Sequence, residues 1–198
     1  MTQLTIAADL DRCTGCLSCV VACEEEHGLW PGSSYIRLEQ IGPHGDFPDL
    51  AMYYLPIACQ QCRRPSCAAA CAANAIGRDT RGVLTLSAEA CTGCGDCVPA
   101  CPYAAISMDP SGELPGLCDL CAGLSTAGHA PACVAACPAK ALSLVDADAC
   151  SGERATYEHA HTFALAPSQN LPSARYLLRR QAWRSSGQTG QDARRTAT

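Results

Sequence analysis

Cysteines are the residues of this sequence most able to do chemistry, and the chain contains 17 of them. The stretch Cys91–Pro102 reads CTGCGDCVPACP, with two, two and three residues between successive cysteines and a proline after the last. This spacing is typical of the ligand run of a bacterial [4Fe–4S] cluster. Three thiolates so placed can hold one cluster, whereas the fourth points away and reaches a second cluster. The run therefore predicts partner cysteines elsewhere in the chain.

Three further groups of cysteines follow related spacings. The first, CTGCLSCVVAC, repeats the spacing in full, and the second, CQQCRRPSCAAAC, widens the middle spacing to four residues. The last group has eleven residues between its second and third cysteines. In chain order the groups are Cys13, Cys16, Cys19 and Cys23; Cys59, Cys62, Cys67 and Cys71; Cys91, Cys94, Cys97 and Cys101; and Cys118, Cys121, Cys133 and Cys137. If each triplet takes its fourth thiolate from a partner group, the sixteen cysteines form four [4Fe–4S] sites. Spacing alone allows either first with fourth and second with third, or first with second and third with fourth.

Zinc and disulfides are the competing uses of clustered cysteines. A structural zinc site needs two pairs of ligands, not triplets with an additional cysteine three residues on. Disulfides are not expected, because the sequence shows no cleavable signal peptide that would direct the chain to an oxidising compartment. Cys150 lies outside every group and is expected to be an ordinary, partly buried thiol. The histidines are expected in solvent or in loops, because none takes a ligand position: His27, His44, His129, His159 and His161.

Short elements must position these groups. Gln3–Ala8 is predicted to be a strand that leads into the first group, and Val83–Leu86 a strand that leads into the third. Gly28–Pro48 is rich in Gly and Pro, contains a plausible strand at 35–38, and is expected to be an inserted surface segment.

An internal repeat extends beyond the cysteines. Five residues after the last cysteine of groups two, three and four comes a large apolar residue preceded by alanine, in CAANAI, CPYAAI and CPAKAL. The repeat predicts a short helix after each of these cysteines, with Ile76, Ile106 or Leu142 packed over a cluster.

Charge and composition exclude several classes of function. The net charge is −5 and the chain has a single lysine, Lys140, so a nucleic-acid role has little support. No apolar run approaches the eighteen residues of a membrane span. There is no phosphate loop, dinucleotide motif or nucleophile arrangement. A non-catalytic electron-transfer protein is the leading hypothesis, and a free soluble polyferredoxin is the alternative.

The order of the four groups resembles that of the iron–sulfur subunits of the dimethyl sulfoxide reductase family, partners of molybdenum or tungsten bis-pterin oxidoreductases. The resemblance is close over residues 4–145 and looser in the segment RYLL. Ala72 departs from the family pattern, because a proline follows the last cysteine in groups three and four. Cys94 is present where the nitrate reductase branch has a Trp, so four-iron clusters are expected at every site.

The resemblance implies that the first group pairs with the fourth and the second with the third. The implied ligand sets are Cys13, Cys16, Cys19 and Cys137; Cys118, Cys121, Cys133 and Cys23; Cys59, Cys62, Cys67 and Cys101; and Cys91, Cys94, Cys97 and Cys71. It further implies a relay between a catalytic molybdopterin subunit, on the side of the Cys13 site, and a quinone-reactive integral membrane anchor, on the side of the Cys91 site.

The expected fold is α+β, with two duplicated ferredoxin-like modules, one nested in the other, and long cluster-organised loops. Residues 1–58 and 108–145 would form the outer module, with an insertion at 28–50, and residues 59–107 the inner one. Residues 146–183 are expected to dock to partner subunits, and 184–198 to be a disordered tail. The protein is expected at the membrane through its partners, either in the cytoplasm or co-exported to the periplasm, without a signal peptide of its own.

Overall fold

The largest sheet joins the beginning of the chain to its later parts. The computed structural model describes residues 3–109, 112–148, 161–163 and 169–178. Strand β1 (Leu4–Asp9) lies between β8 (Leu142–Asp146), which is antiparallel to it, and β10 (Arg175–Leu178), which is parallel. Strand β9 (His161–Phe163) completes the order β8-β1-β10-β9. The predicted strand at Gln3–Ala8 is thus confirmed, and it is buried along almost its whole length.

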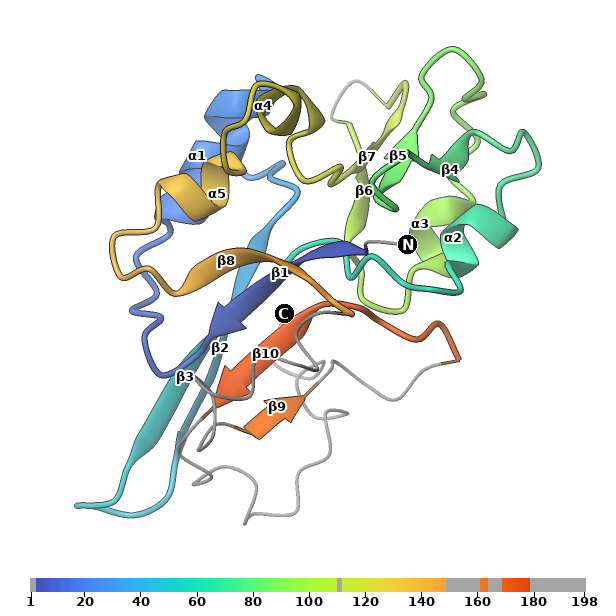
Figure 1. Cartoon of the computed structure of the whole chain (residues 1–198). Coiled ribbons are helices and arrows are strands. Elements are labelled where there is room, and N and C mark those ends of the chain that lie inside the picture. Colours follow the sequence, from blue (N-terminus) through green and yellow to red (C-terminus); the bar gives the residue numbers. More distant parts are fainter. Residues whose placement is uncertain (1–2, 110–111, 149–160, 164–168, 179–198) are drawn as a thin grey trace.

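Within the described residues, five short helices lie outside this sheet (Figure 1). Helix α1 (Ser18–His27) contacts α5 (Ala132–Ala135), and α4 (Ala122–Thr126) lies near them on the same side of the picture. Helix α2 (Ser66–Ala69) contacts α3 (Cys97–Ala100) in the other part of the molecule. Helices from the first and fourth cysteine groups are therefore neighbours, as are those from the second and third. None of the helices in the described ranges is long and apolar enough to cross a membrane.

Two small hairpins accompany α2 and α3. Strand β4 (Ile76–Arg78) pairs with β5 (Leu84–Leu86), and β6 (Ile106–Met108) pairs with β7 (Pro115–Leu117), both antiparallel. The strand predicted at Val83–Leu86 is therefore present.

The helix predicted after the fourth cysteine of each repeat is wrong. In groups two, three and four the short helix precedes that cysteine, and Ile76, Ile106 and Leu142 each begin a strand. The intervening residue Asn74, Ala104 or Lys140 has a positive φ of 51, 47 or 51°. A left-handed residue ends a helix and redirects the chain, so the helix cannot continue past the cysteine.

The segment predicted to be a surface insertion contains strand β2 (Arg37–His44), which forms a hairpin with β3 (Ala51–Ile57) directly after the segment. Its tip extends away from the other elements (Figure 1), and Phe47 there is 88% exposed. Its base is not a surface feature, because Ile36 is only 2% exposed and packs in the core with Leu55 and Ile57.

Arg37 attaches the base of this hairpin to the third cysteine group. Its guanidinium donates hydrogen bonds to the carbonyl oxygens of Tyr103 and Ala104, each at 2.8 Å, in the turn that follows Cys101. It also pairs with Glu39 at 3.0 Å. The hairpin therefore braces one ligand-bearing turn while its tip stays exposed.

The end of the described chain is part of the sheet. Tyr176, Leu177 and Leu178 of β10 are all buried, so the apolar character of this segment is explained by its own packing against β1. Cys150, most of the extension predicted at 146–183 and the tail predicted at 184–198 lie outside the described residues.

Candidate metal centres

Sixteen cysteines of the four groups lie in the described part of the chain, and all are free thiols. Cys19, Cys23, Cys133 and Cys137 belong to the core built around β1 and β8. Cys59, Cys67 and Cys97 belong to a second core, between the small hairpins. The buried thiols of groups one and four in the first core thus share one environment, those of groups two and three in the second core share another, and Cys118 packs against both.

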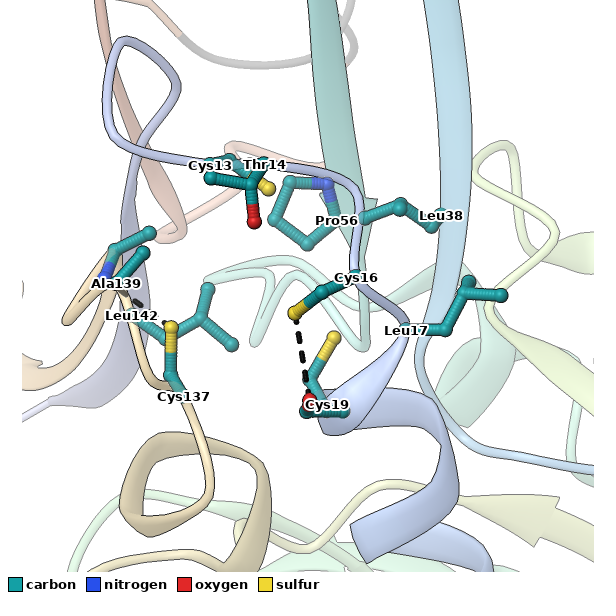
Figure 2. A pocket seen from close by; sticks show the side chains of 12 residues that line it. Cys13, Thr14, Cys16, Leu17, Cys19, Leu38, Pro56, Cys137, Ala139 and Leu142 are labelled. Carbon is teal, nitrogen blue, oxygen red and sulfur yellow. Dashed lines mark hydrogen bonds between the residues drawn. The ribbon is translucent and has the colours of Figure 1, made fainter.

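One hollow is bordered by the first predicted ligand set. Figure 2 shows the sulfur atoms of Cys13, Cys16, Cys19 and Cys137 directed toward a common space. The hollow has a volume of about 340 Å³, and its other walls include Leu38, Pro56, Ala139 and Leu142. Strand pairing explains why these cysteines lie together. Because β1 pairs with β8, chain segments more than a hundred residues apart come together at one end of the two strands.

A second hollow is bordered by the second predicted set, Cys23, Cys118, Cys121 and Cys133. Its volume is about 310 Å³, and Ile6, Ile36 and Leu120 form apolar walls. Helices α1 and α5, which are in contact, supply Cys23 and Cys133.

The inner groups meet through α2 and α3. The Ser66 hydroxyl on α2 donates a hydrogen bond to the carbonyl oxygen of Ala100 on α3, at 2.5 Å. Burial raises the pKa of the Cys67 thiol, and the charge of Cys101 raises it further. The pKa of Cys97 is raised by its own burial and by the charges of Cys71, Cys91 and Cys94. Each triplet therefore lies within electrostatic reach of the fourth cysteine of the other group.

The same backbone turn recurs in all four CxxC segments. The residue before the second cysteine has a left-handed φ of 72° at Gly15, 47° at Gln61, 69° at Gly93 and 59° at Leu120. Such a turn lets two cysteines separated by two residues face the same side. Glycine accommodates it in groups one and three, whereas Gln61 and Leu120 are held there by burial, at 0% and 1% exposed.

A second backbone feature recurs at the fourth cysteine of groups two, three and four. The backbone N–H of the alanine four residues later donates to the cysteine sulfur: Ala75 to Cys71 at 3.3 Å, Ala105 to Cys101 at 3.5 Å and Ala141 to Cys137 at 3.2 Å. The repeat seen in the sequence is therefore a structural repeat. Group two keeps this bond although it has Ala72 in place of proline.

Burial makes several of these thiols harder to deprotonate. It raises the pKa of Cys19 to about 11 and that of Cys62 and Cys118 to about 12, and nearby cysteine charges add to each shift. Cys16 differs, because its exposed sulfur lies 3.4 Å from the Ser18 hydroxyl, which lowers the thiol pKa. Iron binds thiolates, so loading these sites must release protons.

The arrangement fits iron–sulfur clusters better than single ions. Within the described ranges, no three His, Cys, Asp or Glu side chains converge closely enough to hold one metal ion. In the first two predicted sets the cysteines border a hollow instead of meeting at a point, as an iron–sulfur cubane requires and tetrahedral zinc does not.

Electrostatic effects between thiols link each predicted ligand set to the next. Burial raises the pKa of Cys133, with Cys19 of the first set among the charges that add to it. The pKa of Cys59 is raised by burial and then by Cys118, and that of Cys67 by burial, Cys101 and, more weakly, Cys97. The predicted sets that begin at Cys13, Cys118, Cys59 and Cys91 therefore lie within electrostatic reach of one another in that order.

His27 was not anticipated as a site residue. The sequence pattern predicted it in solvent or a loop, but its Nε2 lies 3.5 Å from the Cys121 sulfur and its ring borders the second hollow. One signal could have indicated this position. His27 comes four residues after Cys23, and residues four apart share a face of a helix.

Comparison with known proteins agrees with this chemistry. The family described as 4Fe–4S dicluster domain matches residues 50–147. Protein NrfC of Escherichia coli (strain K12) is 34% identical over 142 residues, which are 71% of this chain and 64% of NrfC. The chain therefore spans less than two thirds of the length of that relative.

Two further relatives are covered more fully. The thiosulfate reductase electron transfer subunit PhsB of Salmonella typhi is 32% identical over 142 residues, 71% of this chain and 74% of PhsB. The B subunit of the anaerobic dimethyl sulfoxide reductase of Escherichia coli (strain K12) is 31% identical over 183 residues, 88% of this chain and 85% of that protein. The family expected from the cysteine groups is confirmed: the chain belongs to the iron–sulfur subunits of the molybdopterin oxidoreductase family.

Proposed function

We propose that this chain is a non-catalytic relay that carries electrons through four [4Fe–4S] clusters between a catalytic subunit and a membrane anchor. The observation that carries the proposal is that exposed cysteines occur only in the first and the last of the four proposed ligand sets. Within the described residues, Cys16 of the first set and Cys94 of the last are exposed, and the other fourteen are buried or half-buried. Electrons would enter and leave at the two ends, while the central sites are shielded from solvent.

The ligand assignment in this proposal is the nested one. Cys13, Cys16, Cys19 and Cys137 would hold the first cluster, and Cys23, Cys118, Cys121 and Cys133 the second. Their shared hollows support this pairing. Cys59, Cys62, Cys67 and Cys101 would hold the third, and Cys71, Cys91, Cys94 and Cys97 the fourth. Contact between α2 and α3 and the mutual effects on thiol pKa values support these two sets.

Each cluster, when bound, supplies one-electron redox chemistry. The protein's own residues set the conditions for it. Backbone N–H groups of Ala75, Ala105 and Ala141 direct their dipoles at cysteine sulfurs, and buried apolar walls keep water from the central sites. Such hydrogen bonds and exclusion of solvent are the means by which a protein adjusts cluster potentials.

The names of the relatives support a partner with a catalytic site. PhsB is named as an electron transfer subunit of thiosulfate reductase, and another relative as the B subunit of dimethyl sulfoxide reductase. In the proposed complex, the Cys13 end faces a molybdopterin-type catalytic subunit and the Cys91 end faces a quinone-reactive membrane subunit. Leu17 and Val21 are exposed beside Cys16 and would be covered by the first of these partners. The protein would be membrane-associated through its partners.

Anaerobic purification of the native assembly tests the proposal. The full chain should carry about sixteen iron atoms and sixteen sulfides, four of each per cluster. It should co-purify with a larger pterin-containing protein and be reoxidised or reduced through that partner. A lone 20.7 kDa protein that exchanges electrons with many donors would instead favour the free polyferredoxin. An iron content below half of the expected value, with all sixteen cysteines intact, would contradict the four-cluster relay.

A further inference from the structure

His27 lies at the end of α1, at the border of the hollow formed by Cys23, Cys118, Cys121 and Cys133. Its Nε2 is 3.5 Å from the sulfur of Cys121, within the range of a hydrogen bond to sulfur. A thiolate ligand can only accept, so the ring nitrogen that faces it must donate. We propose that His27 sets the reduction potential of the second cluster site by donating this hydrogen bond to Cys121. The inference rests on the proposed function.

The internal repeat shows how the first cysteine group differs from the other three at the position of His27. In groups two, three and four, the residue four positions after the last cysteine donates its backbone N–H to that sulfur. The equivalent position in group one is His27, but α1 continues through Cys23 to His27. Within a helix, the backbone N–H bonds to the carbonyl four residues earlier and is not free for sulfur.

The crossed ligand sets make this difference specific to one site. Cys137, Cys101 and Cys71 belong to the first, third and fourth proposed sets, so in each of these sets the fourth cysteine accepts a backbone N–H from the residue four positions later. Cys23 belongs to the second set. The second site lacks this bond at Cys23, and the His27 side chain supplies it with an additional donor through Cys121.

Two further residues hold the imidazole in this position. The rings of His27 and Tyr35 lie with centroids 5.0 Å apart and planes tilted by 52°. Tyr35 in turn occupies the space beside Gly116, where an added Cβ would lie 2.3 Å from the tyrosine Cε1. Gly116 is two residues before Cys118, a ligand of the same proposed site. A side chain at position 116 would displace the Tyr35 ring, which packs on His27.

The physical effect follows from the charge of the cluster. Reduction adds a negative charge to the cluster and its ligands, and a hydrogen bond to a ligand sulfur stabilises the more negative state. Because three of the four cysteines of this site are buried and its walls are apolar, this dipole is weakly screened. Loss of the His27 donor should lower the reduction potential of the second site and leave the other three unchanged.

Redox titration of the full chain, monitored by EPR under anaerobic conditions, tests this. His27→Phe keeps a ring against Tyr35 but removes the donor, and His129→Phe alters an exposed histidine in the loop between Cys121 and Cys133. We expect the equilibrium constant for reduction of one cluster to fall about tenfold in His27→Phe, equivalent to about 59 mV for one electron. His27→Gln should recover part of the loss, and His129→Phe should match the wild type.

Two results would overturn the inference. One is a full complement of iron with four unchanged potentials in His27→Phe, and the other is an equal shift at all four clusters. Either would leave the relay itself intact, because the relay is tested by iron content and reversible reduction. If His27→Phe loses iron, pulsed EPR of the reduced wild-type protein labelled with ¹⁵N-histidine decides the matter. A weak ¹⁵N coupling at one cluster supports the contact, and its absence contradicts it.

Discussion

Gln61 donates a hydrogen bond from Nε2 to the carbonyl oxygen of Cys118, 3.1 Å away, although the two residues are 57 positions apart. Its Oε1 accepts from the backbone N–H of Leu84 at 2.7 Å, and its own carbonyl oxygen accepts from the Gln3 side chain at 3.3 Å. Because Gln61 lies between Cys59 and Cys62, one fully buried side chain joins the ligand loops of the two central sites.

Replacement of this glutamine should therefore destabilise both central sites together. In Gln61→Leu, the Leu84 N–H and the Cys118 carbonyl lose their buried partner, and each unsatisfied group costs about 1–3 kcal/mol. We expect a lower midpoint of urea denaturation under anaerobic conditions and faster release of iron. Gln40→Leu is the matched control, since Gln40 is exposed. Equal midpoints for the two variants would show that the Gln61 bridge contributes nothing to stability.

Cys101→Ser tests the crossed ligand assignment. In the proposed sets, Cys101 belongs with Cys59, Cys62 and Cys67, although it is the last cysteine of the run that begins at Cys91. The variant should lose or convert the third cluster, and the cluster of Cys91, Cys94 and Cys97 should remain. EPR spectra of single and double variants, with Cys71→Ser as the reciprocal case, distinguish the two signals. Loss of the Cys91 cluster in Cys101→Ser would contradict the crossing.

Gly15→Ala should weaken the first site through a steric clash. An added Cβ at Gly15 would lie 2.7 Å from three ring atoms of Tyr54, at a left-handed φ of 72°. Gly112 has nearly the same φ, 74°, but nothing lies within 4 Å of its added Cβ. Gly112→Ala therefore measures backbone strain alone, about 1 kcal/mol, and Gly15→Ala measures strain plus overpacking, about 1–3 kcal/mol more.

Iron content and the EPR signal of the Cys13 cluster, measured after timed exposure to a chelator, report this difference. We expect the Cys13 cluster to be lost first in Gly15→Ala and to persist in Gly112→Ala. Identical rates of iron loss in the two variants would mean that the Tyr54 ring moves aside without destabilising the site.

Assembly of the clusters should depend on pH. Burial raises the pKa of the Cys62 and Cys118 thiols to about 12, so both are protonated in the iron-free protein at neutral pH. Ligation requires the thiolate, and each pH unit lowers the cost of removing one such proton by about 1.4 kcal/mol. Reconstitution with ferrous iron and sulfide should thus be more complete at about pH 8.5 than at about pH 7. Incorporated iron per protein is the measurement, and a yield that falls with pH would contradict the protonated state of these thiols.

Local features of the sequence predicted the strand at Gln3–Ala8 and the repeat after the fourth cysteines correctly, because both depend on near neighbours. The helix expected after those cysteines was wrong for a physical reason. Only Asn74 among the three left-handed residues is of a type that often adopts positive φ, whereas Ala104 and Lys140 do so under the constraint of the surrounding structure. The base of the β2–β3 hairpin was likewise predicted at the surface, because burial of Ile36 depends on distant strands.

The chemistry of this protein could be inferred from its amino-acid sequence without the fold. Cysteines separated by two residues can face one cluster whatever the rest of the chain does, so spacing was sufficient to predict iron–sulfur ligands and to identify the family. Which distant groups lie together depends on the fold, because the pairing of β1 with β8 brings Cys137 to the hollow of Cys13. The positions of His27 and Gln61 depend on it too, since their contacts join residues 94 and 57 positions apart. No local pattern specifies contacts across such separations, because they form only when the sheets and helices pack.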